Sequence, residues 1–188
     1  AVVMRKTAAL LRAAGEVMTD GEADLAMALL ADARSTDYLI RELKDAADEG
    51  LSVVASSPFR VRHKGDLRTM VELVDPLDRA LRSTRVLVRQ TAVAAYRRRP
   101  VPGSYALLAL DLADAADQVA DELAEDRMAT AARTALLAVG EATALVERTQ
   151  LLTADAILAQ LRSVVVDLLM VTGLDQLEST EALPPPPR

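Results

Sequence analysis

The residues best suited to chemistry are four arginines, Arg79, Arg82, Arg85 and Arg89, spaced three, three and four residues apart. On a helix, this spacing places the side chains along one broad stripe. A guanidinium group binds a carboxylate through planar, paired hydrogen bonds, and a row of such groups therefore suits an anionic ligand. The more common use of such a row is a solvated or salt-bridged flank. We take Arg82, Arg85 and Arg89 as candidate residues for binding a carboxylate substrate.

Two charged residues, Arg162 and Asp167, interrupt an otherwise apolar stretch at 160–169. They are five residues apart, about 140° around a helix, and are therefore poorly placed to pair with each other. Each is expected to find a partner on another helix, and Asp167 with Arg82 or Arg85 is the favoured pairing. The sequence thus predicts structural ion pairs that involve Arg85, Arg162 and Asp167.

Other patterns argue against catalysis. Six carboxylates share one segment, which we interpret as a solvated acidic face: Asp111, Asp114, Asp117, Asp121, Glu122 and Glu125. A dimetal carboxylate site in a bundle uses Glu-x-x-His elements, and the chain has a single histidine, His63. We find no nucleophile elbow, phosphate loop or dinucleotide fingerprint. We therefore expect no enzyme, no cofactor and no metal site.

Charge is unevenly distributed along the chain. Residues 60–99 hold 11 of the 22 basic residues and 4 of the 28 acidic ones, and basic clusters lie at 60–65 and 97–99. The basic segment is expected to pair with acidic neighbours, or alternatively to present a surface to anionic lipid or another anionic ligand. Nucleic acid is not expected as a partner, because the whole chain carries a net charge of −6 and no recognition motif accompanies the basic run.

The elements that position these residues are expected to be helices. The chain is rich in Ala and Leu, contains 2% aromatic residues, and has no Cys. Ala and Leu favour helices, whereas the aromatic residues typical of strands are nearly absent. The longest charge-free stretch, residues 100–110, is far shorter than the roughly 20 apolar residues that span a bilayer. We therefore expect no membrane span within this chain.

Apolar periodicity predicts about six long helices and no sheet, arranged as an antiparallel up-down bundle. A seam of apolar residues runs along 66–98, where Pro76 should kink or break the helix. In the stretch 22–56, Ser35, Thr36 and Asp37 are expected to form a bend or the start of a new helix. Residues 1–175 are expected to form one domain, and residues 176–188 a proline-rich, disordered tail.

Three segments resemble a known family. These are the stretch Glu72–Arg89 (ELVDPLDRALRSTRVLVR), Ala159–Ser163 with the following Val166–Leu169 and Thr172–Leu174, and Ser57–Pro58 with its basic loop. They are similar to the aromatic acid exporter family, also called fusaric acid resistance-like proteins. The likeness runs from about Asp20 to Leu174. The part of the family that this chain resembles is the C-terminal, cytosolic helical region of bacterial members, particularly actinobacterial ones.

The resemblance implies that this chain is the soluble domain of an exporter-like membrane protein for small organic acids. The domain would lie at the cytoplasmic face of the cell (inner) membrane and serve assembly, regulation or substrate capture. Its partners would be its own transmembrane half, possible further copies of itself in a homo-oligomer, and an anionic lipid or aromatic carboxylate. The family offers no catalytic residues to carry over. The alternative is a free-standing helical adaptor or regulatory bundle that binds a protein partner.

Overall fold

The computed structural model describes residues 1–56, 64–125 and 127–188, with side chains for 1–50, 52, 71–125 and 127–188. It is an all-helical bundle, and no strand occurs in those ranges. The fold class predicted from the sequence is therefore confirmed. The helices are α1 (Val2–Asp20), α2 (Ala23–Arg34), α3 (Asp37–Ser56), α4 (Lys64–Tyr96), α5 (Gly103–Ala124), α6 (Ala132–Ala142), α7 (Leu152–Val171) and α8 (Gln176–Glu181).

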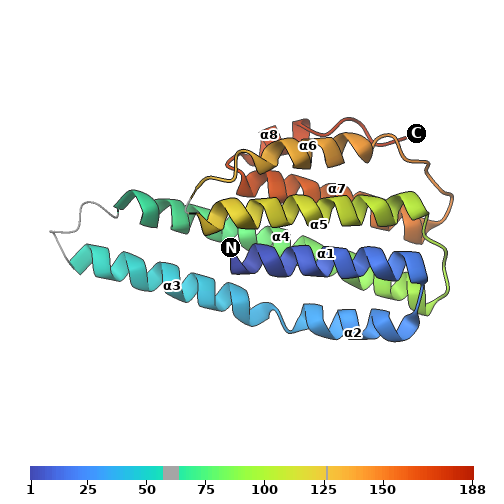
Figure 1. Cartoon of the computed structure of the whole chain (residues 1–188), viewed down its shortest axis with the longest axis horizontal. Helices are drawn as coiled ribbons and strands as arrows, with labels where there is room; N and C mark the ends of the chain where they lie inside the picture. Colours follow the sequence, from blue (N-terminus) through green and yellow to red (C-terminus); the bar gives the residue numbers. More distant parts are fainter. Residues whose placement is uncertain (57–63, 126) are drawn as a thin grey trace.

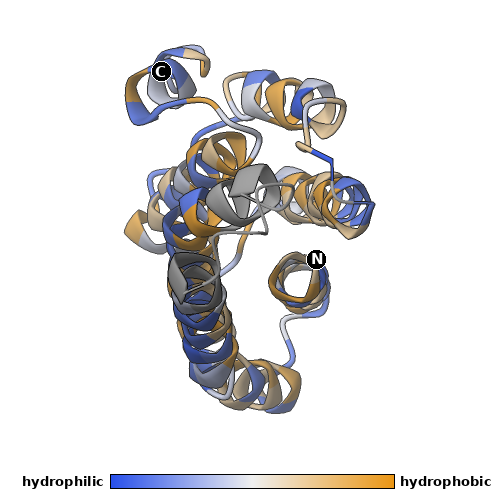
Figure 2. Ribbon diagram, turned by 90° about the vertical axis from the view of Figure 1, so that its left-hand side faces the viewer, coloured by the Kyte–Doolittle hydropathy of each residue, from blue (hydrophilic) through white to orange (hydrophobic). Residues whose placement is uncertain are grey.

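Successive long helices run in opposite directions (Figure 1). Helices α2 and α3 follow one another in the same direction and form a single leg that lies alongside α4. Helix α1 packs against both α4 and α5, and α4 also packs against α7. Viewed roughly end-on, each helix carries both hydrophilic and hydrophobic residues, as amphipathic helices around a shared core require (Figure 2).

The break between α2 and α3 is made by two hydroxyl side chains. Ser35 Oγ donates to the carbonyl of Asp32 at 2.7 Å, and Thr36 Oγ1 donates to the carbonyl of Ala33 at 2.7 Å. Such local bonds compete with the helical ladder and end α2. Thr36 is fully buried, which fixes the bend. Helix α3 then begins at Asp37, at the place where the sequence suggested either a bend or a new helix.

Helix α4 continues through Pro76 from Lys64 to Tyr96 without a break. A proline removes one backbone donor, a local loss that packing on either side can offset. Here Val74 and Leu77 are buried next to the proline, and Leu81 and Val88 continue the buried seam. Of the kink or break predicted at Pro76, the break is therefore absent, because the seam holds the two parts of the helix against the same core.

Residues 176–188 are part of the folded bundle. The Asp175 side chain accepts from the Glu178 backbone N–H at 2.8 Å, and the Glu178 side chain accepts from the Asp175 N–H at 2.8 Å. This reciprocal capping starts α8. Beyond α8, Leu183 packs against the core, and Arg162 donates to the carbonyl of Pro184. The prediction of a disordered tail was wrong, because it weighed the prolines and overlooked the cap and the apolar Leu183.

Candidate functional site

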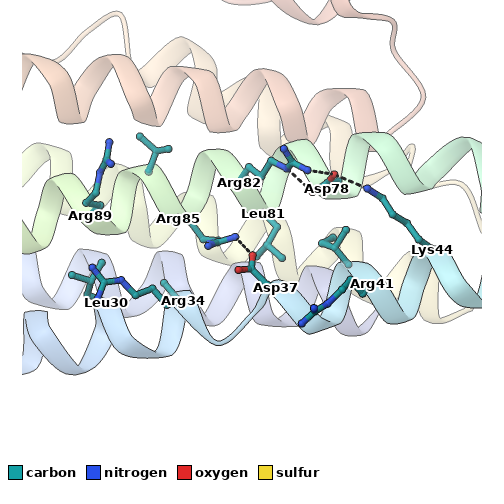
Figure 3. Close-up of a pocket in the computed structure, with 13 residues that line it drawn as sticks. Leu30, Arg34, Asp37, Arg41, Lys44, Asp78, Leu81, Arg82, Arg85 and Arg89 are labelled. Carbon is teal, nitrogen blue, oxygen red and sulfur yellow. Dashed lines mark hydrogen bonds and ion pairs between the residues drawn. The ribbon is translucent and has the colours of Figure 1, made fainter.

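A cleft of about 780 Å³ lies between the α2–α3 leg and α4. We call it the cationic groove. Its lining includes six basic side chains and two acidic ones, a formal balance of +4: Arg34, Arg41, Lys44, Arg82, Arg85 and Arg89 against Asp37 and Asp78. The three candidate residues Arg82, Arg85 and Arg89 all line it (Figure 3).

Two ion pairs across the groove set the register of its walls. Arg85 on α4 pairs with Asp37 on α3, and Asp78 on α4 pairs with Lys44 on α3 at 3.2 Å. The two helices are therefore antiparallel, and positions seven residues apart on one wall face positions seven residues apart on the other. Beyond the bend, Arg34, the last residue of α2, lies on the leg that packs along the part of α4 carrying Arg89, and both residues line the groove (Figure 3).

Asp78 occupies one end of the groove and is fully engaged. Arg82 Nε and Nη2 donate to its two carboxylate oxygens, each at 2.8 Å, and Lys44 donates at 3.2 Å. Burial of the carboxyl opposes its ionisation, but the hydrogen bonds from Arg82 and Lys44 outweigh burial and lower the pKa of Asp78. This bidentate contact demonstrates how the groove holds a carboxylate. Arg82 is thus committed to an internal partner.

The middle of the groove is occupied by the pair between Arg85 and Asp37. The predicted ion pair of Arg85 is therefore present, although its partner is Asp37 and not Asp167. The Asp37 side chain is 61% exposed, whereas the Asp78 side chain is 12% exposed. The two internal carboxylates consequently differ in how firmly the protein holds them.

The other end of the groove carries Arg34 and Arg89. In the described part of the chain, neither guanidinium has a carboxylate partner, and the same is true of Arg41 on the α3 wall. Arg89 was predicted from its spacing on α4. Arg34 and Arg41 were missed, because they lie on a different wall. Arg34 ends α2 and Arg41 lies in α3, so the bend between the two helices hides from the sequence that both side chains line one groove.

Apolar side chains form the remainder of the groove lining: Leu30, Ala33, Ile40, Leu81 and Val86. Ile40 and Leu81 are almost completely buried, while Val86 is partly exposed. Cationic groups beside apolar surface suit a molecule with an acidic head and an apolar body. The chemistry of the lining therefore suits an organic acid. Among the residues described, no cluster of three or more potential metal ligands occurs.

Arg162 and Asp167 lie elsewhere, in a second cleft of about 660 Å³ beside α7 and α8. Asp167 accepts a hydrogen bond from Ser83, and burial raises its pKa in spite of that bond and the nearby Arg79. The predicted pairing of Asp167 with Arg82 or Arg85 is therefore wrong. Ser83 lies on the face of α4 that meets α7, whereas its neighbour Arg82 contacts Asp78 and lines the groove.

Arg162 has neutral partners in the described structure. It donates to Thr143 Oγ1 at 2.7 Å and to the carbonyl of Pro184. Burial lowers its pKa. The predicted structural ion pair of Arg162 is replaced by hydrogen bonds to oxygen atoms without formal charge, which fasten the C-terminal residues to α7.

The remaining charged segments divide into two kinds. The acidic face of α5 is partly neutralised by α1, since Arg12 pairs with Asp114 and Asp117, and Arg5 with Asp121. Of the two basic clusters, Arg97–Arg99 is exposed at the end of α4, and the cluster at 60–65, His63 included, has no described side chains. Among the described residues, neither the acidic face of α5 nor Arg97–Arg99 contributes a side chain to the groove lining.

Comparison with known proteins gives one informative match. The chain is 29% identical over 162 residues to an uncharacterized protein of Corynebacterium glutamicum, and the match covers 81% of this chain. The chain spans 41% of the length of that relative. No protein-family model and no solved structure matches the chain. Within the described residues, no helix combines the length and the apolarity needed to cross a membrane.

Proposed function

We propose that this chain is an extramembrane helical domain of an exporter-like membrane protein for small organic acids, and that its cationic groove captures the acid. The carboxylate binds between Arg34 and Arg89, and the apolar body lies along Leu30 and Val86. The domain resides at the cytoplasmic face of the cell membrane. It acts by binding, without chemistry of its own.

The observation that carries the proposal is the row of cationic positions along the groove. At the first position, Arg82 and Lys44 hold Asp78; at the second, Arg85 holds Asp37. The third, formed by Arg34 and Arg89, lines the same groove with no internal carboxylate among the described residues. Since two positions in the row bind a carboxylate of the protein, the third is suited to a carboxylate from outside.

Two further features support the membrane part of the proposal. The segment Glu72–Arg89, which resembles the aromatic acid exporter family, is the part of α4 that carries the groove arginines. In addition, more than half of the Corynebacterium glutamicum relative lies outside the span that this chain covers. A transmembrane half would belong to such additional sequence.

Binding of naphthalene-2-carboxylate tests the capture of an acid directly. The chain contains no Trp, and naphthoate fluorescence can therefore be followed without overlapping Trp emission. We expect saturable binding that weakens as salt is raised, because the contact is between charges at a partly exposed site. Replacing Arg34 and Arg89 together by Gln should weaken binding about fivefold or more, the effect of losing charge-assisted hydrogen bonds.

The matched control is the replacement of Arg97 and Arg99 by Gln, which removes the same charge from an exposed loop outside the groove. Its affinity for naphthoate should equal that of the wild type. If both double variants lose the same affinity, the acid responds to net charge alone and the groove is not its site.

Fractionation of cells that carry the native full-length protein tests the membrane part. After an alkaline carbonate wash, an epitope on this domain should remain with the membrane pellet. An epitope released into the supernatant would refute the exporter assignment. It would favour the alternative of a free-standing helical adaptor.

A further inference from the structure

Asp37 stands in the middle of the cationic groove, where an incoming acid would meet it. Its carboxylate contacts Arg85, which lies four residues before Arg89 on the same wall. Four residues correspond to about one helical turn, or roughly 6 Å along the axis. The Arg85 guanidinium is therefore a neighbour of the position that we propose for the acid.

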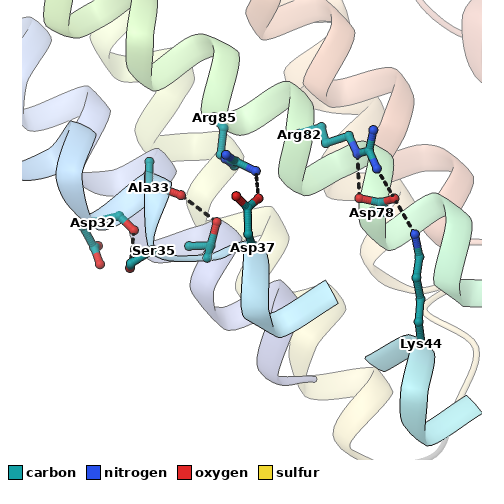
Figure 4. A network of polar contacts seen from close by, with 9 residues as sticks. Asp32, Ala33, Ser35, Asp37, Lys44, Asp78, Arg82 and Arg85 are labelled. Atoms are coloured by element: carbon teal, nitrogen blue, oxygen red, sulfur yellow. Dashed lines mark hydrogen bonds and ion pairs between the residues drawn. The ribbon is translucent and has the colours of Figure 1, made fainter. Parts of the chain in front are cut away.

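The bend before α3 positions the Asp37 carboxylate. Ser35 and Thr36 are tied to the last turn of α2, and Asp37 follows them at once as the first residue of α3 (Figure 4). Because Thr36 is buried, the backbone at this point is anchored to the core. The Asp37 side chain extends from this anchored backbone toward Arg85 (Figure 4).

The exposure of the two internal carboxylates separates a structural partner from a displaceable one. The Asp78 side chain is 12% exposed and holds two cations. The Asp37 side chain is 61% exposed and holds one cation in the described structure. An exposed ion pair of this kind contributes little to stability, since water and salt screen it. Asp37 can therefore release Arg85 with little loss to the fold.

We propose that Asp37 controls the affinity of the groove for acids, as an internal carboxylate that competes with the incoming acid for Arg85. While Asp37 holds Arg85, a bound acid is held by Arg34 and Arg89. When Asp37 releases Arg85, the bound acid has Arg85 available to it in addition to Arg34 and Arg89. Asp37 therefore sets how strongly an acid must bind before it gains the third guanidinium. This inference rests on the proposed capture of acids in the groove.

The test is the affinity for naphthalene-2-carboxylate of the whole chain carrying Asp37→Asn. Freeing Arg85 from an exposed pair should raise affinity about two- to fivefold. The matched control is Asp32→Asn, which removes the same charge five residues earlier. Asp32 pairs with Lys6 of α1 and does not line the groove. This control should raise affinity much less than Asp37→Asn.

A second variant attributes the gain to Arg85. In Asp37→Asn combined with Arg85→Gln, the gain should disappear, and affinity should fall to that of Arg85→Gln alone or close to it. A thermal melt of each variant confirms that the bundle remains folded. The gain from Asp37→Asn should also diminish in high salt, because the contact that it creates is electrostatic.

The outcomes separate this inference from the proposed function. If the wild type binds and Asp37→Asn binds no better than Asp32→Asn, the role of Asp37 is refuted, while capture in the groove stands. If neither the wild type nor Asp37→Asn binds naphthoate, capture itself is refuted. Binding seen with Asp37→Asn and absent from the wild type would support the competition in its strongest form.

Discussion

At the scale of single residues, the role of a charged side chain depends on the face of the helix that it occupies. Arg82 and Ser83 are adjacent in sequence, yet Arg82 contacts Asp78 at the groove and Ser83 donates to Asp167 on α7. Adjacent helical residues point about 100° apart. A carboxylate of α7 therefore meets a serine where the sequence suggested an arginine.

Asp167 provides a pH-dependent prediction. Because burial raises its pKa, the folded protein binds this proton more tightly than the unfolded chain does. The stability of the folded state therefore decreases as the pH rises above 3.8, the ordinary pKa of an Asp carboxyl, and through the raised pKa of Asp167 in the folded protein. Asp167→Asn cannot ionise and can still accept the Ser83 hydroxyl. We expect its melting temperature at pH 7 to be higher than that of the wild type, by about 1–3 °C.

Melting curves measured across the acid range check this expectation. The advantage of Asp167→Asn should shrink as the pH falls and vanish below 3.8, where the wild-type carboxyl is protonated in both the folded and the unfolded state. Asp155→Asn serves as a contrasting variant, because the hydrogen bond from Arg148 lowers the pKa of the Asp155 carboxyl. A loss of several degrees in Asp167→Asn at pH 7 would instead indicate a stabilising buried ion pair.

At the scale of elements, small residues decide how closely two helices approach. An added Cβ at Gly15 of α1 would lie 2.9 Å from Leu110 Cδ2 and 3.1 Å from the Ala106 carbonyl oxygen, both on α5. The backbones of α1 and α5 are therefore in close contact at this position. The pairing depends on the absence of a side chain there.

Gly15→Ala should lower the free energy of unfolding by about 1 kcal/mol, because overpacking exceeds the gain in helix propensity. Chemical denaturation measures this loss. Gly103→Ala is the matched control, since nothing lies within 4 Å of an added Cβ at Gly103. That control should change stability by less than about 0.5 kcal/mol. Equal effects of the two substitutions would contradict the close approach of α1 and α5.

The start of α6 depends on a buried carboxylate from α5. The backbone N–H groups of Ala131 and Ala132 donate to Glu122 at 3.1 and 2.6 Å. These are first-turn groups that otherwise lack a helical partner. Glu122→Ala should therefore reduce the free energy of unfolding by about 1–2 kcal/mol.

Glu122→Gln keeps one acceptor oxygen and should lose about half as much stability as Glu122→Ala. Amide hydrogen exchange at Ala131 and Ala132 should accelerate in both variants, and most in Glu122→Ala. Unchanged exchange in Glu122→Ala would show that another group starts α6.

At the scale of the whole molecule, the sequence predicts the helical class well, because apolar periodicity acts within each helix. The row Arg82, Arg85 and Arg89 is equally local, and all three residues line the groove; their role as ligands of a substrate stays a prediction. The opposite wall, formed by α2 and α3, cannot be predicted from local sequence in this way. Arg41 joins the site through the register of α3 against α4, which the pairs at Asp37 and Asp78 establish, and Arg34 joins it through the packing of α2 against α4.

The C-terminal residues show the same limit. Four consecutive prolines suggest an unpacked tail, but whether Leu183 reaches the core depends on the surface that the other helices leave for it. That surface includes Gly140, where an added Cβ would lie 3.2 Å from Leu183. The cap at Asp175 and Glu178 can be recognised in the sequence, whereas the docking of Leu183 depends on residues elsewhere in the chain. Tertiary packing therefore determines both the docking of the C-terminal residues and the placing of Arg34 and Arg41 in the groove.

The most direct test of acid capture is an NMR titration of the arginine Nε–Hε groups with naphthalene-2-carboxylate. We predict the largest shifts at Arg34 and Arg89, smaller ones at Arg85, and none at the exposed Arg97–Arg99. Saturation of these shifts at one common ligand concentration would place the acid in the cationic groove. Uniform shifts at all arginines, or selective shifts at Arg162 in the second cleft, would contradict the account.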